Sequence, residues 1–213
     1  MLFLLSILAT WVCLYTRKES MAGAGWQLDG RWVQDNILGA LVGVGLMVLA
    51  AGSLWSIGVV SWAPDPARSE RSLGLGLLIF GLVAFWEENL FRGFVFPRLL
   101  GSIGVWPTQA LLALLFSLAH WGNPGMQGLT KFWASLGIAM GAALMGLAYL
   151  RTRSLALPIA LHLGWNCCQG SVLGFGVSSS LSGAGSSRSS TASPNGSVGA
   201  PLDLRRVSSA WPA

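Results

Sequence analysis

The chain has 213 residues, of which 53% are hydrophobic and only 10% are charged. Soluble domains carry about 25% charged residues, so this composition excludes an ordinary soluble protein and predicts a protein embedded in the lipid bilayer. The formal net charge of +5 comes from Lys and Arg residues that are scattered singly or in pairs. Nucleic-acid binding needs a clustered basic face, so we expect no nucleic-acid partner.

The first hydrophobic segment covers residues 1–15 and is followed by a charged run that starts at Arg17. It lacks the basic start of a secretory signal peptide, so we interpret it as a short, uncleaved first helix. Residues 20–35 contain several glycines together with Trp26 and Trp32. This composition is typical of an interfacial loop with aromatic anchors, and we expect it not to cross the membrane.

The segment 36–62 contains no charged residue and exceeds the ~20 apolar residues that span the hydrocarbon layer. A turn at residues 64–66, which contains two prolines, is predicted to close this helix because proline cannot continue it. A third helix is expected from Ser72, with two adjacent glutamates in its final turns. Pro97 and Arg98 are predicted to mark its exit.

Three further helices are expected before the C-terminal tail. The fourth has a core at residues 108–121 that is shorter than a full span, so we expect it to be tilted or half-buried in the bundle. The fifth covers residues 132–150 and the last covers residues 154–175. Residues 176–213 are rich in Ser and Gly and predict a flexible tail. The predicted fold is an all-α, polytopic membrane bundle of about six hydrophobic helices in one domain, residues 1–175.

Positive charges in the loops predict the orientation of the bundle. Cytoplasmic loops carry an excess of Lys and Arg. The larger set, which we expect on the cytoplasmic side, is Arg17, Lys18, Arg31, Arg98, Arg151 and Arg153, and the smaller set is Arg68, Arg71 and Lys131.

Ionisable residues inside the hydrophobic segments are the strongest functional signal, because each costs about 2.5 to 17 kcal/mol at membrane depth. Of the 8 acidic residues, only Glu87 and Glu88 fall in these segments, and both histidines, His120 and His162, do so as well. Asn166 lies one helical turn after His162 and on the same face. Three different helices thus contribute polar groups, and we expect these groups to share an interior.

Each of these residues also has a structural interpretation. Arg92 follows Glu88 by four residues, so the two could form a structural ion pair. A lone His or Asn more often packs or links helices. However, Arg92 cannot fully neutralise two adjacent carboxylates, and the repulsion between Glu87 and Glu88 favours one of them as a base near neutral pH. The coincidence on three helices therefore favours a functional site.

Three chemistries fit this set of residues. In the first, Glu87 and His120 deprotonate a water that attacks a peptide carbonyl, while His162 and Asn166 donate to the oxyanion. In the second, Glu87, His120 and His162 bind a divalent metal such as zinc, which activates the water. In the third, no bond is cleaved and the groups form a proton or ion pathway.

Other catalytic arrangements are less well supported. A serine hydrolase is disfavoured because the chain has no G-x-S-x-G motif and Ser117 has no obvious carboxylate to orient a base. The H-E-x-x-H signature of zinc proteases is also absent from the sequence. The cysteines Cys13, Cys167 and Cys168 lack the spacing of a zinc site or a disulfide framework.

Three motifs follow one another on separate hydrophobic segments. They are Glu87-Glu88-x-x-x-Arg92, Phe116-x-x-x-His120 and His162-x-x-x-Asn166. In this order they resemble the signatures of the CPBP intramembrane proteases, also called the Abi family. That family includes the type II CAAX prenyl endopeptidases and bacteriocin-processing or self-immunity proteins. The resemblance covers roughly residues 72–175.

The resemblance implies an intramembrane endopeptidase that acts on a prenylated or other peptide or on a membrane-protein substrate. It implies that Glu87 and His120 activate water and that His162 and Asn166 stabilise the oxyanion. The implied location is a bacterial plasma membrane or a thylakoid-like inner membrane. The alternative is a non-proteolytic membrane scaffold, an immunity or partner-binding protein, on the same fold.

Glu88 and Arg92 are implied to support the site. The resemblance favours a mechanism without a cofactor, in which a glutamate is the base. The metal-dependent alternative, with zinc bound by Glu87, His120 and His162, stays open at this point.

Overall fold

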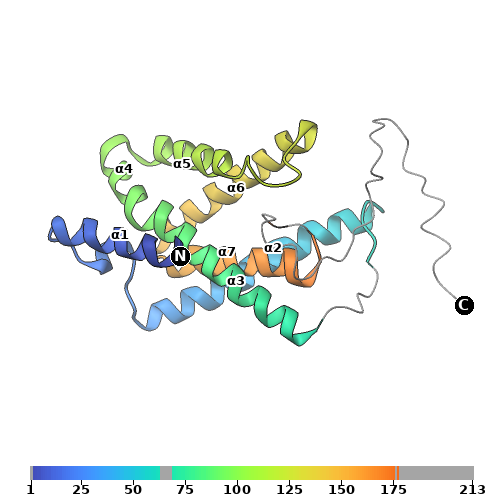
Figure 1. Cartoon of the computed structure of the whole chain (residues 1–213), viewed down its shortest axis with the longest axis horizontal. Coiled ribbons are helices and arrows are strands. Elements are labelled where there is room, and N and C mark those ends of the chain that lie inside the picture. The colour runs from blue at the N-terminus through green and yellow to red at the C-terminus, as the bar shows by residue number, and fades with distance from the viewer. Residues whose placement is uncertain (1, 63–68, 176, 178–213) are drawn as a thin grey trace, which may run out of the picture.

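The computed structural model describes residues 2–62, 69–175 and 177, and the regular structure within these residues is helical (Figure 1). A 3-10 turn, η1, covers Met21–Ala24, and two π-helical segments, η2 and η3, cover Asn89–Val95 and Cys167–Val172. The α-helices are α1 (Leu2–Thr16), α2 (Gly30–Ser56), α3 (Glu70–Glu88), α4 (Phe96–Ile103), α5 (Val105–Ala119), α6 (Gly128–Thr152) and α7 (Ala156–Asn166). Because η2 joins α3 to α4, the described residues form six helices, and the predicted fold class is confirmed.

Three of these helices are long and apolar enough to cross a membrane. They are α2, the continuous helix Glu70–Ile103 and α6. Helices α1 and α5 are apolar but shorter, as expected for the fourth predicted helix. The long helices expose many large apolar side chains, including Leu41 and Met140, and a hydrocarbon layer would cover such surfaces. The chain is therefore an integral membrane protein.

The second helix begins earlier than its uncharged segment suggested. Asp29 caps α2, since its side chain accepts a hydrogen bond from the backbone N–H of Trp32 at 3.0 Å. The cap lets the helix include the charged residues Arg31 and Asp35, so the predicted loop at residues 20–35 is shorter than expected.

The second helix also ends earlier, at Ser56 instead of residue 62. Gly58 follows with a φ of +72°, a conformation that glycine adopts without strain. The predicted turn at residues 64–66 lies outside the described residues. So does the predicted tail at residues 176–213, apart from Val177.

The third helix does not end at Pro97, as the sequence predicted, but continues to Ile103. The π-helical segment η2 precedes the proline, and the backbone N–H of Phe96 bonds to the carbonyl oxygen of Phe91. In a π-helix each bond spans five residues. Pro97 then falls in the first turn of α4, where its missing N–H removes no required hydrogen bond.

Glycines let α2 and α7 pack backbone against backbone. A Cβ atom added to Gly39 would lie 2.5 Å from a carbonyl oxygen of α7, and one added to Gly43 would overlap the carbonyl oxygen of Leu161. On α7, a Cβ atom added to Gly164 would lie 2.5 Å from the carbonyl oxygen of Ala40 on α2. Small residues permit such close helix packing in lipid. This contact supports α7, which carries His162 and Asn166.

We expect Gly43→Ala to destabilise the protein by about 1–3 kcal/mol, because the added methyl group must push two helix backbones apart. Gly45→Ala on the same helix is the matched control, since its Cβ would meet nothing within 4 Å. Thermal unfolding in detergent micelles measures the difference. Equal melting temperatures for the two variants would contradict the tight contact.

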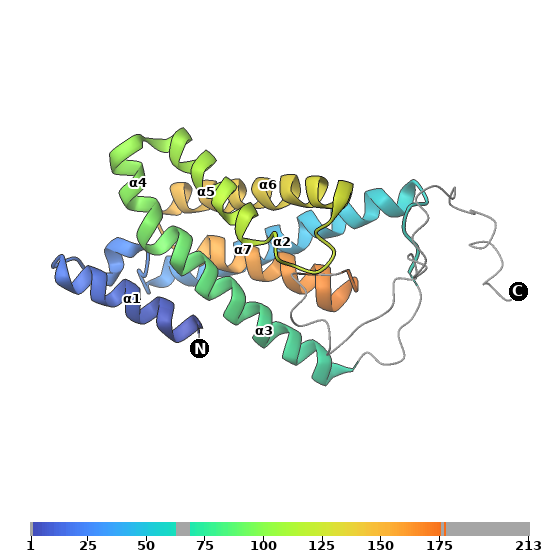
Figure 2. The ribbon, with the colours of Figure 1, turned by 45° about the horizontal axis from the view of Figure 1, so that its top comes forward.

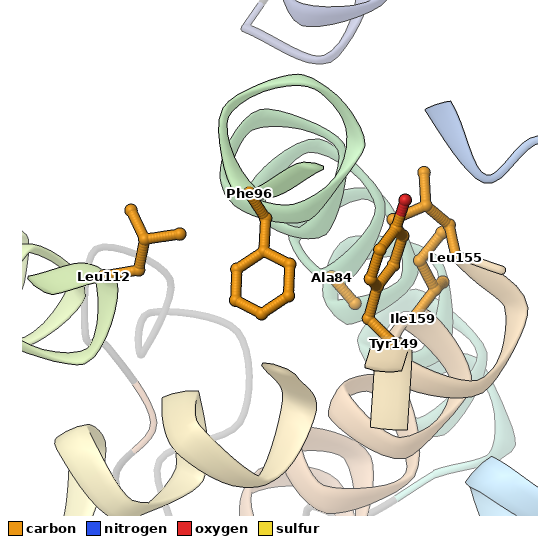
Figure 3. Close-up of a cluster of buried hydrophobic side chains, with 6 residues drawn as sticks. All are labelled: Ala84, Phe96, Leu112, Tyr149, Leu155 and Ile159. Carbon is orange, nitrogen blue, oxygen red and sulfur yellow. The ribbon is translucent and has the colours of Figure 1, made fainter. Parts of the chain in front are cut away.

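A buried apolar cluster joins five elements of the bundle (Figure 3). The ring of Phe96 meets the ring of Tyr149 edge-on, with centroids 5.5 Å apart. The cluster connects α3, α4, α5, α6 and the segment at the start of α7, and its members are Ala84, Phe96, Leu112, Tyr149, Leu155 and Ile159. Helices α5 and α6 lie side by side, and α7 lies between α2 and α3 (Figure 2).

A buried polar network connects the N-terminal elements to the end of α3. Asn89 is fully buried at the start of η2. Its amide nitrogen donates to the hydroxyl of Thr10 at 3.1 Å, and its oxygen accepts from the indole N–H of Trp26 at 3.0 Å. These bonds hold α1 and the segment after η1 against the segment that carries the adjacent glutamates.

An exposed ion pair connects α1 to α4. Glu19, just after α1, pairs with Arg98 and accepts a hydrogen bond from Arg17 at 3.1 Å. The hydrogen bond from Arg17, and secondarily the charge of Arg98, lowers the pKa of the Glu19 carboxyl. Glu19 is therefore charged at neutral pH and forms the ion pair with Arg98.

Candidate active site

The end of α3, the end of α5 and the middle of α7 bring five of the six predicted site residues together: Glu87, Glu88, Arg92, His120 and His162. Asn166, the sixth, is the last residue of α7. The carboxylates are in the last turn of α3, the arginine is in η2, and a histidine and an asparagine are on α7. His120 is the C-cap of α5 and is half-buried. The other predicted site residues are all buried: Glu87, Glu88, Arg92, His162 and Asn166.

Glu88 is the centre of a buried hydrogen-bond network. Its Oε1 accepts a hydrogen bond from Nη1 of Arg92 at 3.2 Å and lies 2.9 Å from Nδ1 of His162. Nη2 of Arg92 donates to the carbonyl oxygen of Ala142 on α6 at 2.7 Å. The ion pair that the four-residue spacing predicted is therefore present, and it also connects α3 to α6 and α7.

The ring of His162 lies between the two carboxylates. Its Nδ1 faces Glu88, and its Nε2 lies 3.7 Å from Oε2 of Glu87. Within the described part of the chain, Oε2 of Glu87 is buried and has no hydrogen-bond partner. Buried polar oxygens are normally hydrogen-bonded, so this atom is suited to bind water or a substrate group.

Glu87 and His120 line the same cavity, which has a volume of about 180 Å³. A water molecule takes about 30 Å³ of liquid volume, so the cavity has room for several waters. Most of its walls are aromatic or apolar, and its lining residues are Trp86, Glu87, Phe91, Phe116, Ala119, His120 and Asn123.

The backbone fixes the tautomer of His120. Its Nδ1 lies 2.7 Å from the carbonyl oxygen of Phe116. A carbonyl oxygen only accepts hydrogen bonds, so Nδ1 carries the proton, and Nε2 of the neutral ring is a proton acceptor. The geometry thus gives the cavity two acceptors, a carboxylate of α3 and an imidazole nitrogen of α5.

The ring of Phe116 lies close to Arg92 and to both histidines. Its ring lies 4.6 Å from the ring of His120 and 6.2 Å from that of His162. The guanidinium carbon of Arg92 lies 5.2 Å from its centroid. A cation over an aromatic face is stabilised in a desolvated site. Phe116 thus packs between the three cationic or basic side chains.

Sequence reasoning missed several residues around the site. It did not predict the role of Asn89 in holding α1, although a polar residue next to Glu88 inside an apolar helix was a usable signal. Trp86 and Phe91 line the cavity. Aromatic residues are common in membrane helices, so no sequence signal distinguished these two from lipid-facing rings.

The donor atoms do not fit a metal site as they are placed. Among residues 2–62, 69–175 and 177, no group of three or more His, Cys, Asp or Glu side chains converges closely enough to hold a metal ion. Within the predicted ligand set Glu87, His120 and His162, Nδ1 of His162 bonds to Glu88 and Nδ1 of His120 bonds to a backbone carbonyl. Such Nδ1 bonds are also typical of metal-bound histidines, whose Nε2 is the ligand atom, so the misfit lies only in how the described side chains are placed.

These features define a polytopic helical membrane protein in which two buried carboxylates, a buried histidine and a half-buried histidine lie beside a cavity. Residues 69–168 match the family described as type II CAAX prenyl endopeptidase Rce1-like, so this part of the chain is similar to that family. The match confirms the family resemblance predicted from the three motifs, and it includes all six predicted site residues. No curated protein and no solved structure matches the chain.

Proposed function

We propose that the protein is an intramembrane endopeptidase of the CPBP type and uses a glutamate as its base. The observation that carries this proposal is the shared cavity of Glu87 and His120, with His162 3.7 Å from Glu87. Hydrolysis of a peptide bond needs proton acceptors beside a space that can hold water, here Glu87 and His120, and a further polar group for the oxyanion, here His162.

The first step is activation of a water molecule in the cavity. Glu87 accepts one proton of the water, and Nε2 of His120 accepts a hydrogen bond from the other, which orients the attacking oxygen. That oxygen forms a bond to the carbonyl carbon of the substrate. The carbonyl π electrons move to the carbonyl oxygen, which becomes the oxyanion.

The second step is collapse of this tetrahedral intermediate. Nε2 of His162 and the amide of Asn166 donate hydrogen bonds to the oxyanion. The electron pair of the oxyanion restores the carbonyl, the C–N bond breaks, and the proton held by Glu87 passes to the leaving nitrogen. The products are a carboxylic acid and an amine, and Glu87 is again ionised.

The membrane location and the cavity lining support a proposal for the substrate class. The cavity is small and has three aromatic residues in its walls, Trp86, Phe91 and Phe116, so it suits an apolar side chain of a peptide substrate. We propose a membrane-associated peptide or membrane protein, with a prenylated peptide as the family-based candidate. The proposed location is a bacterial plasma membrane or a thylakoid-like inner membrane.

A direct test uses the purified full-length protein in lipid vesicles. A prenylated CAAX peptide, the same peptide without the prenyl group, and a membrane-peptide extract are each incubated with the wild-type protein and with Glu87→Gln. A cleavage product that depends on Glu87 in mass spectrometry supports the proposal. If all three samples stay intact, the protein is a non-proteolytic scaffold, a partner-binding protein or an ion pathway on this fold.

We expect cleavage to persist after chelation, because the proposed base is a carboxylate and the histidines present no convergent ligand set. The measurement is the cleavage rate after treatment with a strong zinc chelator, with metal analysis of the same sample. A rate that falls to background and returns when zinc is added would establish the metal-dependent alternative.

A further inference from the structure

Asn123 lines the cavity of the candidate active site, and the proposed reaction gives it no role. It is half-buried in the loop between α5 and α6, three residues after His120. Three of the described residues that line the cavity have strongly polar side chains, namely Glu87, His120 and Asn123. Asn123 therefore places a side-chain amide in the same space as the proposed base.

The location of the attacking water determines where the substrate carbonyl must lie. Glu87 and His120 both line this cavity, so a water molecule that they activate lies within it. The carbonyl carbon must come within about 3–3.5 Å of that water for attack to occur. The carbonyl oxygen, on which negative charge develops, then lies in the cavity as well.

Asn123 supplies the type of group that this developing charge requires. A side-chain amide has two N–H donors and an oxygen with two lone pairs, so it can keep a bond within its loop while it donates to a substrate. The amide does not titrate, so this donor is present in every protonation state of the base. His162 and Asn166, the donors assigned to the oxyanion above, are not among the described residues that line the cavity.

The loop that carries Asn123 is connected to both of its neighbouring helices. The backbone N–H of Asn123 donates to the carbonyl oxygen of His120 at 3.0 Å. Trp121 anchors the start of the loop on α6, because its indole N–H donates to Oγ of Ser135 at 2.9 Å. The ammonium group of Lys131 lies 3.8 Å from the centroid of the Trp121 ring. These contacts keep the spacing between Asn123 and His120, and donors that are placed before the reaction stabilise charge most effectively.

We propose that Asn123 is a further catalytic residue, which donates a hydrogen bond from its side-chain amide to the carbonyl oxygen of the scissile peptide bond. The hydrogen bond strengthens as the water oxygen adds to the carbonyl carbon and negative charge develops on the carbonyl oxygen. Asn123 transfers no proton, and the bond weakens again when the C–N bond breaks and the carbonyl is restored. This role rests on the proposed function, because it needs a substrate carbonyl in the cavity.

Asn123→Leu tests this contact, since leucine has a similar shape but no hydrogen-bonding group. The probe is a synthetic copy of the peptide that gives the Glu87-dependent product, the prenylated CAAX peptide in the first instance. We expect kcat to fall about 10²-fold with KM nearly unchanged, as when one oxyanion donor is lost. Gln127→Leu is the matched control and should cleave at the wild-type rate, because Gln127 is an exposed amide of the same loop outside the described cavity lining. A wild-type kcat in Asn123→Leu overturns the proposal.

A thioamide at the scissile bond separates a direct contact from a structural role of Asn123. The sulfur atom that replaces the carbonyl oxygen accepts hydrogen bonds only weakly. If Asn123 donates to this atom, the ratio of kcat for the amide to kcat for the thioamide is about 10-fold smaller in Asn123→Leu than in the wild-type protein, a coupling typical of groups in contact. A displaced loop slows both substrates equally, so an unchanged ratio overturns the proposal.

A second variant keeps the test decisive if Asn123→Leu does not fold, which thermal unfolding in detergent micelles checks. Asn123→Asp has nearly the same shape as the native residue and replaces the donating nitrogen by an oxygen. We expect the same smaller ratio of amide to thioamide cleavage in this variant. A wild-type ratio in Asn123→Asp overturns the proposal.

Two further outcomes separate this role from its alternatives. Trp86 also has a side-chain N–H and lines the cavity, and Trp86→Phe removes that donor but keeps an aromatic ring. A ratio that falls in Trp86→Phe and not in Asn123→Leu assigns the contact to the indole and overturns the proposal. Glu87-dependent cleavage with an unchanged ratio in Asn123→Leu refutes only the role of Asn123. A wild-type protein that cleaves no sample refutes the proposed function and this role with it.

Discussion

Replacing Glu87 by glutamine is expected to lower kcat about 10²- to 10⁴-fold, the usual contribution of a general base. The amide has nearly the same shape as the carboxylate but cannot accept the proton of the attacking water. The effect is measured as the rate of cleavage of a peptide that the wild-type protein cleaves. Thermal unfolding in the same detergent checks that the variant is folded.

Two comparisons make this experiment specific. Glu70→Gln removes a carboxylate from the exposed start of α3 and should cleave at the wild-type rate. His120→Ala should lose activity, and its combination with Glu87→Gln should be little worse than Glu87→Gln alone, because residues that act on one water are not additive. Wild-type cleavage by Glu87→Gln would place the base elsewhere.

Arg92→Met is expected to cost about 3–5 kcal/mol of stability, because it leaves a buried carboxylate without its partner. The side chains of Arg92 and Glu88 are 1% and 0% exposed, so solvent does not screen the loss. The substitution also removes the donor to the carbonyl oxygen of Ala142. Thermal unfolding in micelles measures the cost.

Arg98→Met is the matched control on the same continuous helix. Arg98 pairs with Glu19, whose side chain is 42% exposed, and exposed ion pairs contribute little. Adding Glu88→Gln to Arg92→Met should recover part of the lost stability, since both buried charges are then gone. Equal melting temperatures for Arg92→Met and Arg98→Met would show that the buried pair is not stabilising.

The helices could be predicted because hydrophobic length and charge dominate in a membrane protein. The helix boundaries could not be predicted where a capping bond or a π-helical turn determines them. The cap at Asp29 extends α2 backward over charged residues, and η2 shifts the register so that Pro97 falls where a helix tolerates it. Hydrophobic patterning indicates neither a capping bond nor a π-helical turn.

The site likewise contains one contact that the sequence predicts and one that it does not. The pair of Glu88 and Arg92 was predictable because four-residue spacing places two side chains on one helix face. The contact between Glu88 and His162 joins residues 74 positions apart, so it depends on how α3 packs against α7. The sequence of the motifs predicted that their polar residues share one region of the bundle. It could not show that His162 lies between two carboxylates.

The glycine contact between α2 and α7 has a consequence for how the cavity adapts to its contents. His162 and Asn166 are on a helix whose Gly164 contacts the backbone of Ala40, so this helix-helix contact has no side chain that can move aside. His120 instead ends α5, just before a loop in which Gly125 has a φ of +86°. Helix ends and loops open at lower free energy than packed helix centres. We therefore expect differences in substrate size to be accommodated on the α5 side, while the α7 side keeps a constant shape.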